Sequence, residues 1–167
     1  EYFIADFSKN FLENSKKNLK DRNILFKDFF IESFPLPFED NQFDFVISYE
    51  TIEHISDYKN FFSEIIRVTK KNGLIILTCP NISWEIVHFI AAVLNINHSE
   101  GPHTFLKKKL IDDIIKKHEL TVLNYNTSIF FPFNNRVSIK LDKFFSKITP
   151  KIIKEKLFLR HSYILKK

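Results

Sequence analysis

The 167-residue sequence has no methionine, two glycines and one cysteine. Two glycines exclude a collagen-like chain and leave no glycine-rich phosphate-binding loop. The single cysteine, Cys79, cannot form an intramolecular disulfide, which is typical of a reducing compartment. No apolar run approaches the roughly 20 residues that a membrane-spanning helix needs. Residues 1–10 also lack the basic and apolar regions of a cleavable signal peptide. We therefore expect a cytoplasmic protein.

The length and composition are those of one folded domain. Apolar residues make up 44% of the chain and charged residues 27%, which excludes intrinsic disorder. Because the sequence begins with Glu1 and contains no methionine, we expect a single domain over residues 1–167 that lacks its N-terminal part.

The charge is distributed unevenly. Residues 1–100 carry 10 Lys or Arg against 15 Asp or Glu, whereas residues 101–167 carry 15 against 5, so the balances are −5 and +10. The basic C-terminal half predicts either a solvated lysine-rich surface or contact with an anionic partner such as a membrane surface.

Short apolar runs alternate with amphipathic segments along the chain, which is typical of an α/β protein with a mostly parallel sheet and helices on both faces. We expect three helices to begin at capping residues, which are Ser8, Asp57 or Ser56, and Thr104. We expect the helix that begins at residue 56 or 57 to end before Asn72-Gly73. The expected strands are 2–5, 23–27, 43–48, 74–78, 119–131 and 158–165, and the expected helices are 9–20, 57–70, 83–94, 105–118 and 137–148.

Polar side chains follow the predicted strands. Asp6 and Asp28 end the first two strands, residues 48–50 end the third, and residues 79–81 end the fourth. In open α/β sheets ligands bind at the carboxyl ends of strands. Two carboxylates there suit a ligand with a sugar diol and an exocyclic amine, because carboxylates accept hydrogen bonds and those groups donate them. Taken singly, each aspartate could instead cap a turn.

A second group of polar residues lies in the run Glu50-Thr51-Ile52-Glu53-His54. If this run is helical, Glu50, Glu53 and His54 share one face.

Cys79 is expected to be a buried small side chain, because no base accompanies it. His98, His118 and His161 are expected at loop or surface positions.

Five segments, in order, resemble class I S-adenosylmethionine-dependent methyltransferases (type 11/23-like): IADFSKNFLENSKKN, ILFKDFF, FPLPFEDNQFDFVIS, ETIEHI and IIRVTKKNGLIILTCPN. The resemblance covers residues 2–81 clearly and the C-terminal half more weakly. It implies a Rossmann-like three-layer α/β/α fold with strand order 3-2-1-4-5-7-6 and a C-terminal antiparallel strand. The family's first strand and glycine-rich loop would lie upstream of Glu1, which leaves a gap in the sheet between the first and third predicted strands.

The resemblance also assigns residues to the cofactor, S-adenosylmethionine. Asp6 would hold the ribose hydroxyls and Phe7 would lie against the adenine. Asp28 would accept from the adenine amino group, with Phe29 beside it. Tyr49 and Glu50 would lie near the methionine moiety.

Three roles stay open for Glu53 and His54, which the resemblance places on the substrate side. They could form a buried hydrogen-bonded pair, His54 could act as a general base, or both could join Glu50 and His103 around a divalent ion, as in some related O-methyltransferases. We assign the pair to catalysis and assign no metal site.

The resemblance implies methyl transfer, with an oxygen of a small-molecule, lipid-like or glycan-linked acceptor as the expected target. Residues 82–102 and 130–150, which would set specificity, are rich in apolar and aromatic side chains. The alternative is a cofactor-free remnant that acts as a binding or scaffold module. A nicotinamide-dependent dehydrogenase fits less well, because the segment FPLPFEDNQFDFVIS with the Glu-His that follows it is unlike a hydride-transfer site. No nucleic-acid partner is expected.

Overall fold

The computed structural model describes residues 1–85, 105–129 and 136–167. These residues form two compact units, 1–39 and 40–167. The expectation of a single domain stays a prediction. The Thr104 cap, and most of the helix expected over 83–94, lie outside the described residues.

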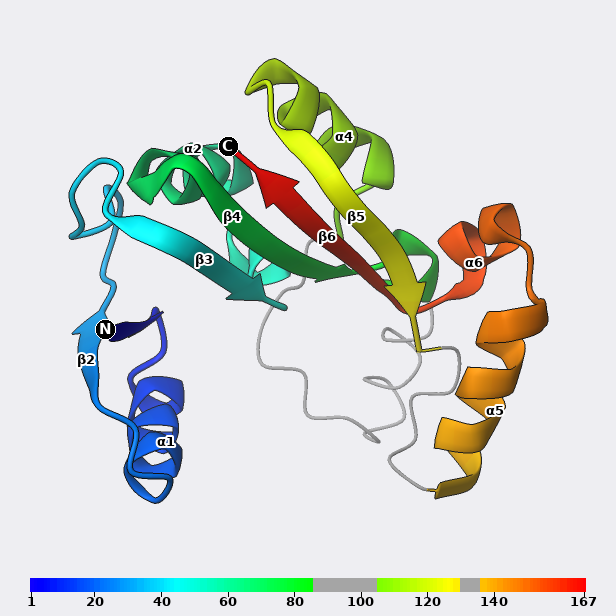
Figure 1. Cartoon of the computed structure of the whole chain (residues 1–167), viewed down its shortest axis with the longest axis horizontal. Coiled ribbons are helices and arrows are strands. Elements are labelled where there is room, and N and C mark those ends of the chain that lie inside the picture. Colours follow the sequence, from blue (N-terminus) through cyan, green and yellow to red (C-terminus); the bar gives the residue numbers. More distant parts are fainter. Residues whose placement is uncertain (86–104, 130–135) are drawn as a thin grey trace. The chain divides into compact units, whose positions relative to one another are not determined.

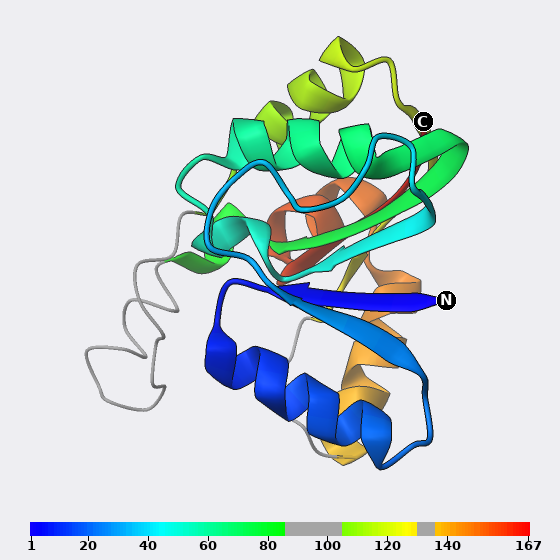
Figure 2. The same cartoon turned by 90° about the vertical axis from the view of Figure 1, so that its left-hand side faces the viewer.

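The first unit is a parallel strand pair with one helix along it (Figure 2). β1 (Tyr2–Asp6) leads into α1 (Lys9–Lys20), whose bounds are those expected from the sequence. The Ser8 hydroxyl caps α1 by accepting from the Phe11 N–H, and Leu12 is its buried residue.

The second strand of this unit, β2 (Phe26–Phe30), begins later than expected. The expected start at Asn23 is wrong because that residue has a positive φ of 56° and the Ile24 N–H still donates to the Leu19 carbonyl. The chain therefore leaves α1 through a longer turn. Asp28 consequently lies in the middle of β2, opposite Ile4, and not at its end.

The second unit is built on a four-stranded sheet (Figure 1). Its strands, in the spatial order β3-β4-β6-β5, are β3 (Phe43–Tyr49), β4 (Thr69–Pro80), β6 (Arg160–Lys166) and β5 (Thr121–Ser128). β3 is parallel to β4, and β6 is antiparallel to both of its neighbours, so the expected C-terminal antiparallel strand is confirmed.

The strand orders of the two sheets follow the order that the resemblance implied. Without its first strand, the order 3-2-1-4-5-7-6 becomes two sheets, β2-β1 and β3-β4-β6-β5. Among the described residues no ladder joins β1 to β3. The outward-facing Phe45, Ile47 and Tyr49 on β3 are exposed.

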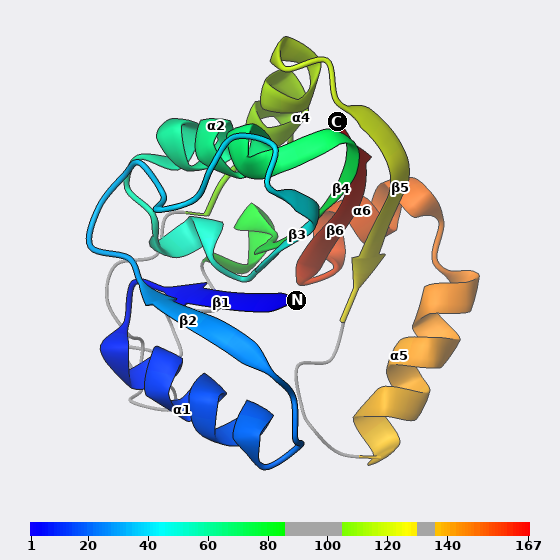
Figure 3. The same cartoon turned by 60° about the vertical axis from the view of Figure 1, so that its left-hand side comes forward.

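Two helices cover one face of the four-stranded sheet, α2 (Tyr58–Val68) and α4 (Lys108–Lys117), as Figures 1 and 3 show. The Asp57 carboxylate caps α2 by accepting from the Asn60 N–H at 3.1 Å. α4 begins three residues later than expected. Burial alternates along β6, as expected for a strand with one face against helices. The buried side chains of this core include Phe61, Phe62, Ile65, Ile75, Leu77, Ile111, Ile115, Tyr163 and Leu165.

The junction between α2 and β4 differs from the expected helix stop at Asn72-Gly73. The helix ends at Val68, and the Thr69 hydroxyl donates to the Ile65 carbonyl at 2.5 Å. Residues 70–73 lie opposite the single residue Asp44, so they form a bulge in the ladder between β3 and β4. Gly73 is required there, because a Cβ atom would lie 2.9 Å from the Lys70 carbonyl oxygen and 3.0 Å from that of Asp44.

The C-terminal part contains α5 (Arg136–Ile148), as expected, and a short helix α6 (Lys151–Leu157) that the sequence pattern did not indicate. α6 contacts the turn η2 (Ile82–Trp84), where the Trp84 indole N–H donates to the Leu157 carbonyl at 2.7 Å. No helix in the described part of the chain is long and apolar enough to cross a membrane.

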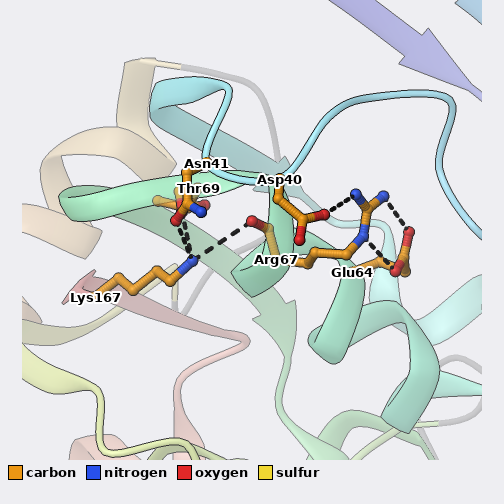
Figure 4. Close-up of polar contacts among 6 residues, drawn as sticks. All are labelled: Asp40, Asn41, Glu64, Arg67, Thr69 and Lys167. Atoms are coloured by element: carbon orange, nitrogen blue, oxygen red, sulfur yellow. Dashed lines mark hydrogen bonds and ion pairs between the residues drawn. The ribbon is translucent and has the colours of Figure 1, made fainter.

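A group of ion pairs and hydrogen bonds joins distant parts of the second unit (Figure 4). The Arg67 guanidinium donates twice to the Glu64 carboxylate and once to Asp40, each at 2.8 Å. The Lys167 ammonium donates to the Thr69 carbonyl at 2.6 Å and to the Asn41 side chain at 3.0 Å. The loop before β3, the end of α2 and the end of β6 are thereby tied together.

Candidate active site

In the first unit, Asp6 lies at the carboxyl end of β1, as expected. Its Oδ1 atom accepts from the Ser8 N–H at 2.7 Å, which is a turn cap. The other carboxylate oxygen has no partner among the described residues and can accept hydrogen bonds from a ligand. Phe7, the next residue, packs edge-on against Phe34 with ring centroids 5.6 Å apart.

Asp28 is less well suited to a ligand than expected. It lies mid-strand, and its carboxylate pairs with Lys16 of α1 at 3.0 Å. Phe29 stacks on Phe3 with ring centroids 5.7 Å apart. The carboxylate that follows the end of β2 is Glu32, which is exposed and was not singled out from the sequence. The sequence would have indicated Glu32 only if the end of β2 had been predicted correctly.

In the second unit, Tyr49 and Glu50 lie at the carboxyl end of β3, as expected, and the structure adds Arg160 from β6. The Arg160 guanidinium lies 4.8 Å from the centre of the Tyr49 ring, and its Nε is 3.0 Å from Glu50 Oε1. Glu50 has a positive φ of 46°, and its N–H donates to the Thr78 hydroxyl at 3.0 Å. Nothing in the local sequence indicated Arg160, because it comes from the last strand.

Glu53 is the buried carboxyl group of this cluster, with 5% of its surface exposed. Burial raises its pKa to about 7, and the negative charge of Glu50 raises it as well, against the lowering effects of its own backbone N–H and of Arg160. Its Oε2 atom has no hydrogen-bond partner within the described part of the chain. The side chain can therefore hold or release a proton near neutral pH.

The helix that would place Glu50, Glu53 and His54 on one face does not form over the whole run. Only Ile52–His54 forms a turn of 3-10 helix (η1), and Glu50 precedes it in a left-handed backbone conformation. Glu53 is buried but His54 is exposed, so these two do not form a buried pair.

A metal-binding role for these residues gains no support from the geometry. No three His, Cys, Asp or Glu side chains are grouped to hold a metal ion in the ranges that the structure describes. The Glu50 carboxylate lies against Arg160, and His103 is outside the described residues.

Cys79 is a buried small side chain, as expected, and burial raises the pKa of its thiol. The expectation for His161 is wrong, because this residue lies buried on β6 and not at the surface. The Tyr125 hydroxyl and His161 Nδ1 share a hydrogen bond of 2.8 Å, and burial lowers the pKa of His161 to about 4. The imidazole is consequently neutral at physiological pH.

Comparisons with known proteins identify the fold, and one family model matches the N-terminal part of the chain. Residues 1–77 match the model described as a methyltransferase domain. A solved structure of a SAM-dependent methyltransferase from Aquifex aeolicus superposes with a TM-score of 0.56 at 11% identity, over 98% of this chain and 67% of that one. The fold is thus the Rossmann-like α/β/α fold of class I methyltransferases, as expected.

Curated relatives agree with this class. A demethylmenaquinone methyltransferase of Staphylococcus saprophyticus is 37% identical over 76 residues, which are 46% of this chain and 32% of that protein. A ubiquinone biosynthesis O-methyltransferase of Pelagibacter ubique is 26% identical over 152 residues, 86% of this chain and 62% of that protein. The chain therefore spans less than two thirds of the length of these relatives. Residues 1–77 are thus similar in sequence to the methyltransferase domain family, and the chain has the fold of class I methyltransferases.

Proposed function

We propose that the protein containing this chain transfers a methyl group from S-adenosylmethionine to an oxygen atom of a small, quinone-like or otherwise lipid-like acceptor. The observation that carries the proposal is the match of residues 1–77 to the methyltransferase domain. The Asp6 carboxylate supports the proposal, because its second oxygen can accept hydrogen bonds and the cofactor's ribose hydroxyls donate them.

Methyl transfer needs little from the protein except orientation and a proton acceptor. The methyl carbon moves in line from the cofactor's sulfur to the acceptor oxygen, the sulfur keeps the electron pair of the broken bond, and the acceptor's hydroxyl proton must leave. Glu53 is the proposed general base, because a carboxyl group with a pKa of about 7 is partly ionised at neutral pH. Arg160 pairs with Glu50, and the negative charge of Glu50 contributes to the raised pKa of Glu53.

His54 is the second candidate for the proton acceptor. It is exposed and directly follows Glu53. The two candidates differ in environment, because the Glu53 side chain is buried and the His54 side chain is exposed. Glu53→Gln removes the ionisable carboxyl group and keeps its shape, and His54→Asn removes the imidazole ring.

The nature of the acceptor is supported by the relatives. By their names, one relative is a demethylmenaquinone methyltransferase and the other an O-methyltransferase of ubiquinone biosynthesis, and this chain is 37% and 26% identical to them over the matched residues. We infer a phenolic, quinone-type acceptor on this ground, and lipid-linked or glycan-linked acceptors are the alternatives to be compared.

Calorimetry with S-adenosylhomocysteine on the full protein tests cofactor binding. We expect saturable binding, which Asp6→Ala weakens. No binding at millimolar ligand would contradict the proposal and favour the alternative, a cofactor-free binding or scaffold module. Turnover of a demethylated quinol with radiolabelled cofactor then tests the acceptor.

Treatment with a chelator distinguishes a general base at Glu53 from a metal site formed by Glu50, Glu53 and His54. We expect turnover to be insensitive to chelator and to rise with pH through an ionisation near 7, with Glu53→Gln removing that ionisation. Loss of activity with chelator and its return with a divalent ion would contradict the role of Glu53 as general base.

A further inference from the structure

The helix α5 presents an apolar surface that no other described element covers. Its residues Val137, Leu141, Phe144 and Ile148 are 67%, 38%, 57% and 58% exposed. In Figures 1 and 3, α5 (orange) lies beyond the end of β5 and does not lie over the sheet. We call these four residues the α5 stripe.

The α5 stripe is continuous, because its members are four, three and four residues apart. At about 100° per residue, the four side chains point within roughly 30° of a common direction. Large exposed apolar surfaces of this kind mark interaction sites, because water solvates them poorly.

A row of basic residues runs along one flank of the stripe: Arg136, Lys140, Lys143 and Lys147. The same helical geometry places this row about 100° from the stripe. All four side chains are exposed, and none has an ion-pair partner among the residues that the structure describes. On the other flank, Ser138 is buried, so that side of α5 faces the protein.

We propose that α5 binds in the interface of an anionic phospholipid membrane. The apolar stripe would enter the boundary between headgroups and acyl chains, and the basic row would contact the negatively charged headgroups. Residues 136–157 carry seven Lys or Arg and two Asp or Glu, so the charge of this region complements an anionic surface. This surface chemistry favours a lipid partner over a second copy of the chain, whose α5 would carry the same positive charge.

The arrangement matches an interfacial helix and not a membrane-spanning one. α5 has 13 residues, and the described part of the chain contains no helix able to cross a membrane. The adjacent α6 adds an exposed Ile152 and the exposed Lys151 and Lys156 to the same region of sequence.

Vesicle co-sedimentation tests the proposal. The full protein is mixed with vesicles of phosphatidylcholine alone or of phosphatidylcholine with phosphatidylglycerol, without cofactor or acceptor. We expect binding to the anionic vesicles, weakened by salt, and little binding to the neutral ones. Equal binding to both compositions, or to neither, would overturn the proposal.

Matched variants assign the binding to the two surfaces of α5. The double variant Leu141→Ser/Phe144→Ser removes half of the stripe, whereas Ile139→Ser changes an exposed residue on the opposite side of α5. Lys140→Glu/Lys143→Glu/Lys147→Glu reverses the basic row, with Lys109→Glu/Lys116→Glu/Lys117→Glu on α4 as the control of equal charge. We expect at least an about tenfold loss of partitioning with the two α5 variants and less than about twofold with the controls.

A tryptophan probe keeps the test independent of disruptive substitutions. F144W in a Trp84→Phe background should be quenched by lipids brominated on their acyl chains. Unquenched emission on bound protein, or sedimentation of the protein as a dimer that Leu141→Ser/Phe144→Ser dissociates, would overturn the proposal. Because no step requires cofactor or methyl acceptor, a failed vesicle experiment leaves the methyl-transfer proposal intact, and the reverse also holds.

Discussion

Glu53 and His161 are buried ionisable side chains whose pKa values move in opposite directions. Burial raises that of Glu53 to about 7 and lowers that of His161 to about 4, because burial disfavours the charged form of each. Both groups are therefore mostly neutral inside the protein near pH 6, and each makes stability depend on pH in its own window.

Glu53→Gln is expected to stabilise the protein at alkaline pH. In the unfolded chain the carboxyl ionises near pH 4.5, but in the folded chain it does so only near 7. The wild type consequently loses free energy of unfolding as the pH rises between these values, by roughly 2 kcal/mol after allowance for partial solvent access. Urea unfolding at pH 5 and pH 8 measures this slope, which the variant should lack. An identical slope in both proteins would contradict the pKa of Glu53.

His161→Phe is expected to reduce the loss of stability of the protein at acid pH. The folded imidazole resists protonation until about pH 4, whereas the unfolded one takes up a proton near 6.5. The wild type therefore loses stability as the pH falls through this range. The variant loses the Tyr125 hydrogen bond and is less stable at neutral pH, by about 1 kcal/mol. Thermal unfolding from pH 7 to pH 4 distinguishes the two effects, since a variant that keeps the wild-type acid slope would exclude His161 as its source.

Asp6→Ala is expected to weaken cofactor binding more than Asp28→Ala. Asp6 lies at a strand end with one free carboxylate oxygen, whereas Asp28 lies mid-strand and pairs with Lys16. Losing the acceptor for buried hydroxyl donors costs about 1–3 kcal/mol each. Calorimetry with S-adenosylhomocysteine gives the affinities, and Glu32→Ala is the informative third variant. An equal or larger loss with Asp28→Ala would reverse the assignment.

The junction of α2 and β4 shows how a single backbone position constrains neighbouring elements. Gly73 is the last residue of the bulge 70–73, directly before β4 pairs again with β3 at Leu74. Gly73→Ala is expected to destabilise the protein by about 2 kcal/mol, because the added methyl group meets two backbone carbonyl oxygens that cannot move independently. Chemical unfolding measures the loss, with Ser63→Ala in the exposed part of α2 as the control. A change below about 0.5 kcal/mol would show that the bulge relaxes.

The Arg67 cluster ties the end of α2 to the loop before β3. Arg67→Met is expected to cost about 1–2 kcal/mol, because it leaves the buried Glu64 carboxylate without the guanidinium that donates to both of its oxygens. Lys16→Met breaks a surface pair with Asp28 and should cost much less. Equal losses in urea unfolding would contradict the importance of burial.

The molecule as a whole has the strand orders that its sequence resemblance implied. The sequence placed β1, α1, β3 and α5 well because capping residues and apolar periodicity act over a few residues. The predicted β2 was three residues too early, because its start depends on the turn at Asn23. The sequence did not predict α6, whose C-terminal residue Leu157 contacts the distant Trp84. These determinants are backbone conformation and long-range packing, which a local pattern does not contain.

The residues of the candidate site also differ in how far the sequence alone predicts their positions. Sequence alone placed carboxylates at Asp6 and Glu50, since a strand end follows directly from where an apolar run stops. Only the tertiary structure brought Arg160 from the last strand against Tyr49 and Glu50, buried Glu53 but not its neighbour His54, and placed His161 in the core. A side chain's burial, and therefore its pKa, depends on which distant elements pack over it, and that packing minimises exposed apolar area over the whole unit.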